Sequence, residues 1–128
     1  QRKALKKFIL IIAFLISGCS EVINHNYPTY QDALENQLFE RGWLPNILPE
    51  STTKIIVNND LDLNASAGSF VIAKPDLTVF VSQLTLVNGK DSVFEYSSGR
   101  SVWRFTIEEN GLVDYLLLAN EETAVNRK

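Results

Sequence analysis

Residues 103–117, WRFTIEENGLVDYLL, are the most completely specified part of this 128-residue chain. Apolar and polar side chains alternate on both sides of Asn110-Gly111, a pattern typical of two strands joined by a tight turn. A two-residue turn would place Ile107 opposite Asp114 and so put a charge among apolar neighbours. A three-residue loop that ends at Gly111 avoids this and gives the glycine the left-handed bulge position. It aligns three apolar pairs on one face: Ile107 with Val113, Phe105 with Tyr115 and Trp103 with Leu117.

Sheet and helix signals alternate upstream of this hairpin. Branched and aromatic residues predict strands at 53–57, 69–73 and 92–96, with Gly68 as a bulge.

Two segments have helical periodicity. Thr29 and Asp32 form a capping-box pattern, and apolar residues then recur at helical spacing, so we expect a helix over 30–41. A second helix begins at Pro75-Asp76. Together these elements predict an α+β domain, in which an antiparallel sheet of four to five strands has two helices packed on one face.

The segment after the first helix is rich in proline. Pro45 and Pro49 forbid a continued helix and force the residues before them into extended shapes. Four large apolar residues can then cover the core as a belt: Trp43, Leu44, Ile47 and Leu48. We expect Trp43 to belong to this belt. An exposed Trp43 would instead indicate an anchor for a protein partner, because tryptophan is enriched among the residues that dominate protein-protein affinity.

The N-terminal segment has the order of a secretory signal. A basic head of four Lys and Arg residues precedes an unbroken apolar run, 8–16, which is too short to cross a bilayer, since a spanning helix needs about 20 apolar residues. The following Ile16-Ser17-Gly18-Cys19 resembles a bacterial lipobox. That resemblance implies a signal peptide at 1–18 and lipidation of Cys19, which would anchor the chain in a membrane. Ser20, which is not aspartate, favours the outer membrane facing the periplasm.

Loss of residues 1–18 would leave an acidic protein. Of the 12 Lys and Arg residues, 8 would remain beside 15 Asp and Glu, a net charge of −7. Because nucleic-acid binding requires clustered cations, we expect no nucleic-acid partner. The acidity is compatible with a basic protein partner, although a solvated acidic surface explains it more simply. Cys19 is the only cysteine, so no intramolecular disulfide is expected.

The remainder has the size of one domain. Residues 20–27 are polar and lack periodicity, so we expect a lipid anchor and short tether at 19–28. A single α+β domain would occupy 29–120, followed by a polar tail at 121–128.

Three groups of residues are distinctive in combination. They are Gly42-Trp43-Leu44-Pro45 with Leu48-Pro49, then Asp60-Leu61-Asp62-Leu63-Asn64, and finally Trp103-Arg104-Phe105. Together they resemble a family of small bacterial proteins with a YbbD-type head domain, over most of residues 29–118. The resemblance supplies no catalytic residues. Where such proteins occur beside secreted toxins, it implies an immunity or accessory role.

Polar residues give few signals for chemistry. Asp60 and Asp62 begin like a calcium loop, but the glycine and the closing glutamate of that pattern are missing, so we expect an Asx-type turn. His25, the only histidine, lies in the predicted tether, where no rigid scaffold would hold it for catalysis. Arg104 should point away from Trp103 and either pair with an acidic residue or bind a partner's carboxylate. We expect no enzymatic activity, no cofactor and no metal site.

These observations favour a lipid-anchored binding protein of the bacterial envelope. It would be of immunity type and capture a toxin or another protein, with Trp43 and Arg104 as candidate contact residues. The alternative is a structural or assembly lipoprotein that contacts the envelope itself, through the lipid on Cys19.

Overall fold

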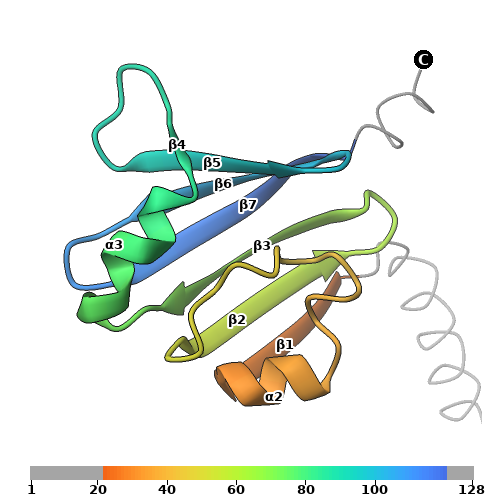
Figure 1. Ribbon diagram of the computed structural model, residues 1–128. Helices are drawn as coiled ribbons and strands as arrows, with labels where there is room; N and C mark the ends of the chain where they lie inside the picture. Colours follow the sequence, from red (N-terminus) through yellow and green to blue (C-terminus); the bar gives the residue numbers. More distant parts are fainter. Residues whose placement is uncertain (1–21, 121–128) are drawn as a thin grey trace, which may run out of the picture.

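The computed structural model describes residues 22–120 and consists of a seven-stranded antiparallel sheet with two helices (Figure 1). The strands are β1 (Val22–Thr29), β2 (Thr53–Asp60), β3 (Ala65–Val71), β4 (Thr85–Leu86), β5 (Val93–Ser98), β6 (Ser101–Ile107) and β7 (Leu112–Asn120). The helices are α2 (Tyr30–Glu35) and α3 (Lys74–Ser82). The strand order is β1-β2-β3-β7-β6-β5-β4, so β3 and β7 lie in the middle of the sheet.

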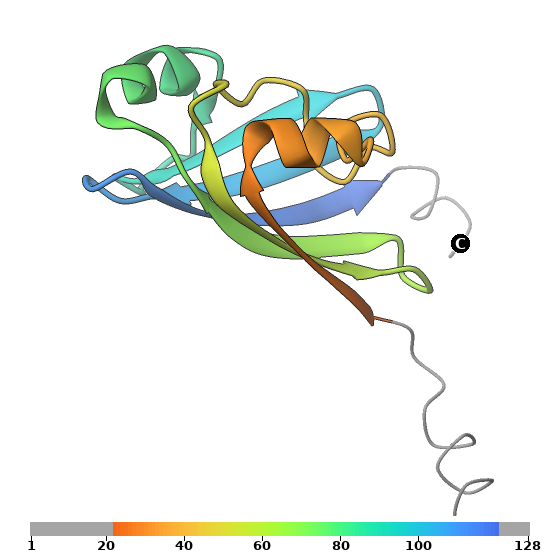
Figure 2. The same cartoon turned by 90° about the horizontal axis from the view of Figure 1, so that it is seen from below.

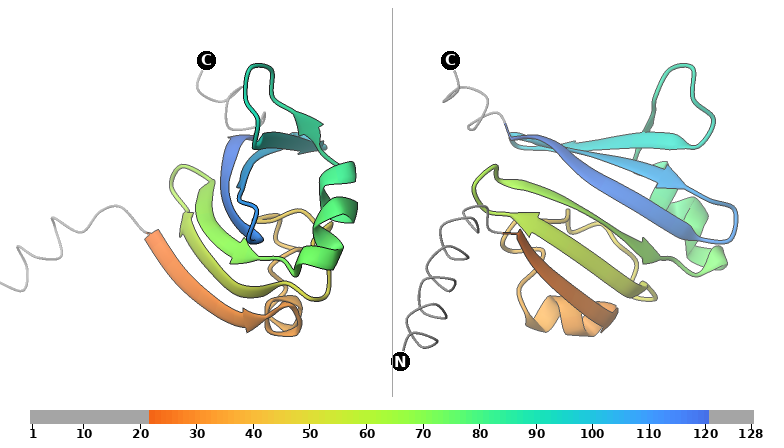
Figure 3. Two further views of the ribbon diagram at one scale, coloured as in Figure 1. Left: turned by 90° about the vertical axis from the view of Figure 1, so that its left-hand side faces the viewer. Right: turned by 180° about the vertical axis from the view of Figure 1, so that it is seen from behind.

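The sheet is curved, and both helices lie on its inner face together with the connection between α2 and β2 (Figures 2 and 3). Side chains on this inner face form the hydrophobic core. At its centre three fully buried rings, Phe70, Phe80 and Phe105, meet edge to face with centroids 5.4–6.1 Å apart. Such aromatic pairs add about 1 kcal/mol each to the burial of their area. The opposite, outer face is not covered by any helix of the described residues.

The predicted strand count of four to five was too low. Two strands at the edges of the sheet were not anticipated: β1, and β4 with only two residues. The predicted bulge at Gly68 was also misplaced, because the irregular register lies in β2 between Thr53 and Ile56. Gly68 is needed for close approach instead, since an added Cβ would lie 1.9 Å from the carbonyl oxygen of Ile56.

The predicted tether at 19–28 is wrong over residues 22–28, which belong to β1. This strand pairs with β2 from Val22 opposite Asp60 to Thr29 opposite Thr53. Its sequence hides this role, because an edge strand exposed on much of its surface need not alternate between apolar and polar residues. Only Tyr27 of β1 is buried.

The first helix begins as predicted but ends early. Thr29 and Asp32 form the capping box, in which the Thr29 side chain accepts from the Asp32 amide and the Asp32 carboxylate accepts from the Thr29 amide, each at 3.2 Å. The helix ends at Glu35 rather than at residue 41, because Gln37 adopts a left-handed conformation with φ of 60°. Residues beyond it continue in turns and still bury their apolar side chains. The second helix has Pro75 in its first turn, as predicted.

The terminal hairpin has the predicted register. Ile107 pairs with Val113, and the other two apolar pairs also align as expected. The Glu108 amide donates to the Leu112 carbonyl at 2.9 Å, and Gly111 has φ of +95°.

A buried chain of polar side chains crosses the core side of the sheet. The Ser66 hydroxyl donates to Asn59 Oδ1 at 2.7 Å and lies 2.7 Å from the Tyr115 hydroxyl. Because Ser66 has only one proton to donate, Tyr115 donates to Ser66 in this arrangement. Burial raises the pKa of Tyr115 to about 12.

We expect Gly111→Val to destabilise the protein more than Asn110→Ala. An added Cβ at Gly111 would lie 2.2 Å from the carbonyl oxygen of Ile72, and the backbone there is left-handed. The cost should exceed about 2 kcal/mol. Asn110→Ala removes only a side-chain acceptor, 3.1 Å from the Leu112 amide, and should cost about 1 kcal/mol. Urea unfolding followed by circular dichroism measures both, and equal costs would contradict this hairpin geometry.

The pKa of Tyr115 predicts a loss of stability in strong alkali. The unfolded tyrosine ionises near pH 10 and the folded one near pH 12, so the stabilisation is complete below pH 10 and disappears as pH rises to 12. This difference is worth about 3 kcal/mol. The free energy of unfolding of the wild-type protein should therefore fall more between pH 9.5 and 12 than that of Tyr115→Phe, by roughly this amount. If the free energies of unfolding of the wild-type protein and of Tyr115→Phe fall equally with pH, the Tyr115 hydroxyl is not buried.

Candidate interaction surface

The outer face of β7 is unusually apolar. Its outward side chains are Leu112, Asp114, Leu116 and Leu118, and we call the three leucines among them the β7 stripe. Leu116 is 49% exposed and Leu118 is 43% exposed. An antiparallel sheet with one face in water is ordinarily polar on that face, so the stripe breaks the expected alternation.

The neighbours of Leu116 leave it open to solvent. It lies between Ala67 of β3 and Arg104 of β6, and the alanine side chain is too short to cover it. Val22 and Ile56, also on the outer face, are exposed as well. These two residues are separated from Leu116 by polar side chains of β2 and β3, whereas Leu116 and Leu118 lie two residues apart on one strand, and neighbouring exposed apolar side chains of this kind commonly mark an interaction site.

Arg104 points to this outer face, as predicted, and its partner is Glu95 on β5. The Arg104 Nη2 and Nε atoms lie 2.6 and 3.0 Å from Glu95 Oε2. Because both side chains are partly exposed, this pair contributes less than about 1 kcal/mol to stability. The pair can therefore open at little cost to let either charge bind a partner.

Trp43 lies on the other side of the sheet. It is partly buried, and its carbonyl oxygen accepts a hydrogen bond from Trp103 Nε1 at 3.0 Å. The belt is confirmed, since Leu44 and Leu48 are buried and Ile47 packs against the core. Because Trp103 and Arg104 are consecutive in β6, they point to opposite faces, so Trp43 and Arg104 do not belong to one site.

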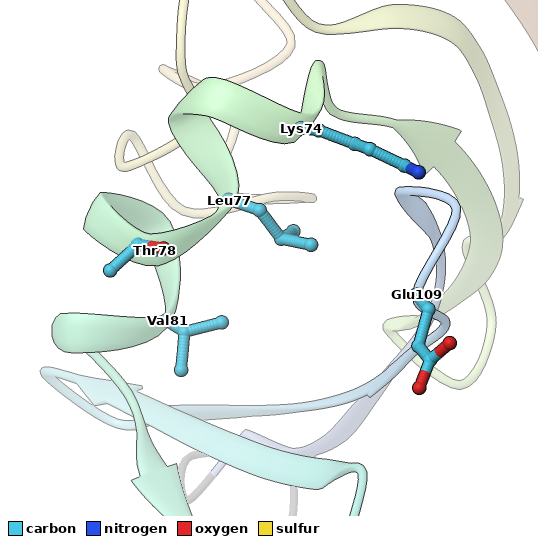
Figure 4. A pocket seen from close by; sticks show the side chains of 5 residues that line it. All are labelled: Lys74, Leu77, Thr78, Val81 and Glu109. Atoms are coloured by element: carbon cyan, nitrogen blue, oxygen red, sulfur yellow. The ribbon is translucent and has the colours of Figure 1, made fainter.

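A second surface feature is a groove of about 430 Å³ beside α3 (Figure 4). Leu77, Thr78 and Val81 line it from the helix, and Lys74 lies near the helix start. Glu109, from the turn between β6 and β7, faces them across the groove. The groove thus combines an apolar wall with one positive and one negative side chain, and it lies on the inner side of the sheet, away from the β7 stripe.

The other polar residues that the sequence singled out, Asp60 and His25, have structural roles in this fold. Asp60 Oδ1 accepts from the Leu63 amide at 3.2 Å, which confirms the predicted Asx-type turn. His25 is part of β1, not of a tether, and stacks on Tyr27 with ring centroids 5.8 Å apart. Among residues 22–120, no three His, Cys, Asp or Glu side chains are grouped to hold a metal ion. Cys19 lies outside the described residues.

The sequence already contained a signal for the β7 stripe. Leu116-Leu117-Leu118 is an uninterrupted apolar run, and alternation requires that its outer two residues share one face. Leu117 pairs with Trp103 on the buried side, so alternation places Leu116 on the outer face. Leu118 lies at a register shift between β6 and β7, and its exposure is seen only in the structure.

No helix within residues 22–120 is both long and apolar enough to span a membrane.

No curated protein and no solved structure matches the chain. The family model described as the YbbD head domain matches residues 21–71, which include β1, α2, β2 and β3. The match contains the Gly42–Pro45 and Asp60–Asn64 motifs and ends before Trp103. From β1 to the end of β3, this chain is therefore similar to the YbbD head domain.

Proposed function

We propose that this chain is a lipid-anchored binding protein of the bacterial envelope, which captures a protein partner on the outer face of its sheet. The observation that carries the proposal is the β7 stripe, where Leu116 and Leu118 are each nearly half exposed on a strand that buries Val113, Tyr115 and Leu117 on its other face. Burying a fully exposed leucine stabilises a complex by about 2 kcal/mol. The two side chains together therefore offer a contribution of about that size to binding.

Charges around the stripe would give such a contact its specificity. Asp114 is on the same strand, and the Arg104–Glu95 pair lies beside Leu116. Within residues 22–120 there are 12 Asp and Glu against 6 Lys and Arg, so this part of the chain has a net charge of −6. Complementary charge chiefly accelerates association and rejects wrong partners. This balance favours a partner with a basic surface.

Anchoring at Cys19 is part of the same proposal. It is supported by the order of basic head, apolar run and lipobox-like Ile16–Cys19, and Ser20 favours the outer membrane facing the periplasm. An immunity-type role, in which the partner is a toxin, is supported by the acidity of the chain and by the similarity of residues 21–71 to the YbbD head domain. Binding rather than catalysis is the role that these features favour.

The test compares two changes of the same chemistry on different surfaces. The doubly substituted Leu116→Gln, Leu118→Gln chain should lose a stoichiometric protein captured from envelope and secreted extracts of the source organism. Leu86→Gln is the matched control, because Leu86 is 54% exposed but lies on β4, away from the stripe. It should retain capture. Melting temperatures should be close to wild type for both, since these leucines are on the surface. Equal capture by the two variants would refute binding at the β7 stripe.

Cys19→Ala separates this proposal from a structural role in the envelope. If the chain captures a protein partner through its sheet, the unlipidated variant still forms the complex in solution with unchanged affinity, although it is released from the membrane. If the chain is an assembly lipoprotein, its associations are with envelope components and disappear with the lipid. Incorporation of labelled palmitate, expected in wild type and absent in Cys19→Ala, tests the anchor itself.

A further inference from the structure

Among residues 22–120, the strand β1 has a neighbour on one side only, so its other edge is free within this part of the chain. It pairs with β2 on one side only and forms the end of the sheet, and Figure 3 shows it at the rim, with α2 near its C-terminal end. We propose that two copies of this chain pair antiparallel through β1 and join their sheets about a two-fold axis at His25. This inference concerns an edge of the sheet and is independent of the partner proposed for the outer face.

The edge lacks most of the features that prevent strand pairing. Exposed edges are usually protected by charged side chains, bulges, prolines or short length. β1 has eight residues, VINHNYPT, with no Lys, Arg, Asp or Glu, and its proline stands next to last. The opposite edge strand β4 has only two residues. Because residues 22–120 have a net charge of −6, two copies repel over much of their surface, and β1 offers an uncharged place to meet.

The hydrogen-bond pattern identifies which backbone groups are free. The Ile72 amide donates to the Gly111 carbonyl at 2.9 Å, which fixes the alternation between β3 and β7. In an antiparallel sheet, the amide and carbonyl groups of successive residues point alternately to the two neighbouring strands. When this alternation is continued from β3 through β2 to β1, the amides and carbonyls of Val22, Asn24 and Asn26 point away from β2, toward the free edge. Pro28 falls in the same set. It has no amide proton, so in a paired dimer the carbonyl of Val22 in the second copy receives no hydrogen bond from Pro28, and the ladder rests on the residues between them.

One register makes the two strands self-complementary. With His25 opposite its own copy, every position from 22 to 28 has a partner. Ile23 then faces Tyr27 of the second copy on the inner side, and Asn24 faces Asn26 of the second copy on the outer side, where the two amides can exchange hydrogen bonds.

Charges on the neighbouring strand agree with the same register. Asp60 is beside Val22 at one end of β1, and Lys54 is beside the other end, between the positions of β2 that pair with Tyr27 and Thr29. An antiparallel pair brings opposite ends together, so Asp60 of one copy and Lys54 of the second lie in one row. The two charges are about three strand spacings, or about 14 Å, apart, so this row avoids the like-charge alignment of a parallel pair without adding a significant attraction.

Disulfide cross-linking tests the proposal in the full chain. With Cys19→Ala as background, His25→Cys places the only two cysteines of the dimer at a closely spaced pair, with Cα atoms about 4.5 Å apart. That separation permits a disulfide. Val22→Cys is the control, because the two copies of this residue are six positions out of register, about 20 Å apart. After mild oxidation in solution, His25→Cys should form at least about tenfold more dimer than Val22→Cys on a non-reducing gel.

A second pair of variants checks the register. Asn24→Cys and Asn26→Cys should cross-link more with each other, when mixed, than either does alone. Equal cross-linking of His25→Cys and Val22→Cys would overturn the proposal, as would cross-linking of His25→Cys to a different protein only. Circular dichroism of each variant shows that the fold is retained, which is expected because these side chains are not in the buried core.

Discussion

The pairing of β3 with β7 is the constraint on which the rest of this structure depends. It aligns Ala67 with Leu116 through Val71 with Leu112, and it joins strands that are more than forty residues apart in the sequence. On one side of this seam lie β1 and β2, and on the other lie β6, β5 and β4. Phe70 secures the seam by contacting the rings of Phe80 and Phe105. Without it the chain would have two separate sheets, β1-β2-β3 and β7-β6-β5-β4, and the side chains of the two halves would no longer share one core.

The same seam also sets the outer surface. Because side chains alternate along a strand, the register that buries Val113, Tyr115 and Leu117 exposes Leu116, and Leu118 at the following register shift is exposed as well. The inner face of β7 therefore packs in the core and stabilises the fold, and its outer face carries the proposed binding surface. The similarity to the YbbD head domain ends at residue 71, which is the last residue of β3. β7, which carries the stripe, lies beyond residue 71, so that similarity does not by itself describe the proposed binding face.

Sequence patterns predicted the elements in which local geometry and burial agree. The terminal hairpin was correct to the residue because three apolar pairs and Gly111 all required one loop length. The first helix was predicted too long, since the apolar spacing continues through Leu38 and Phe39 although the backbone leaves the helix at Gln37. β1 was missed because polar edge strands have no periodic signal. Trp43 and Arg104 were each placed on the correct kind of element, but a sequence cannot show that they lie on opposite faces until the fold is known.

The most direct test of this account is nuclear Overhauser contact between the Hα protons of β3 and β7 in the folded chain. The alternation of hydrogen bonds makes Ala67–Leu116 and Ser69–Asp114 closely spaced pairs, with Cα atoms about 4.5 Å apart. We expect strong Hα–Hα contacts at both pairs. Contacts displaced by one residue, such as Ala67 with Leu117, would contradict the account, because that shift would turn Leu116 into the core and remove the β7 stripe from the surface.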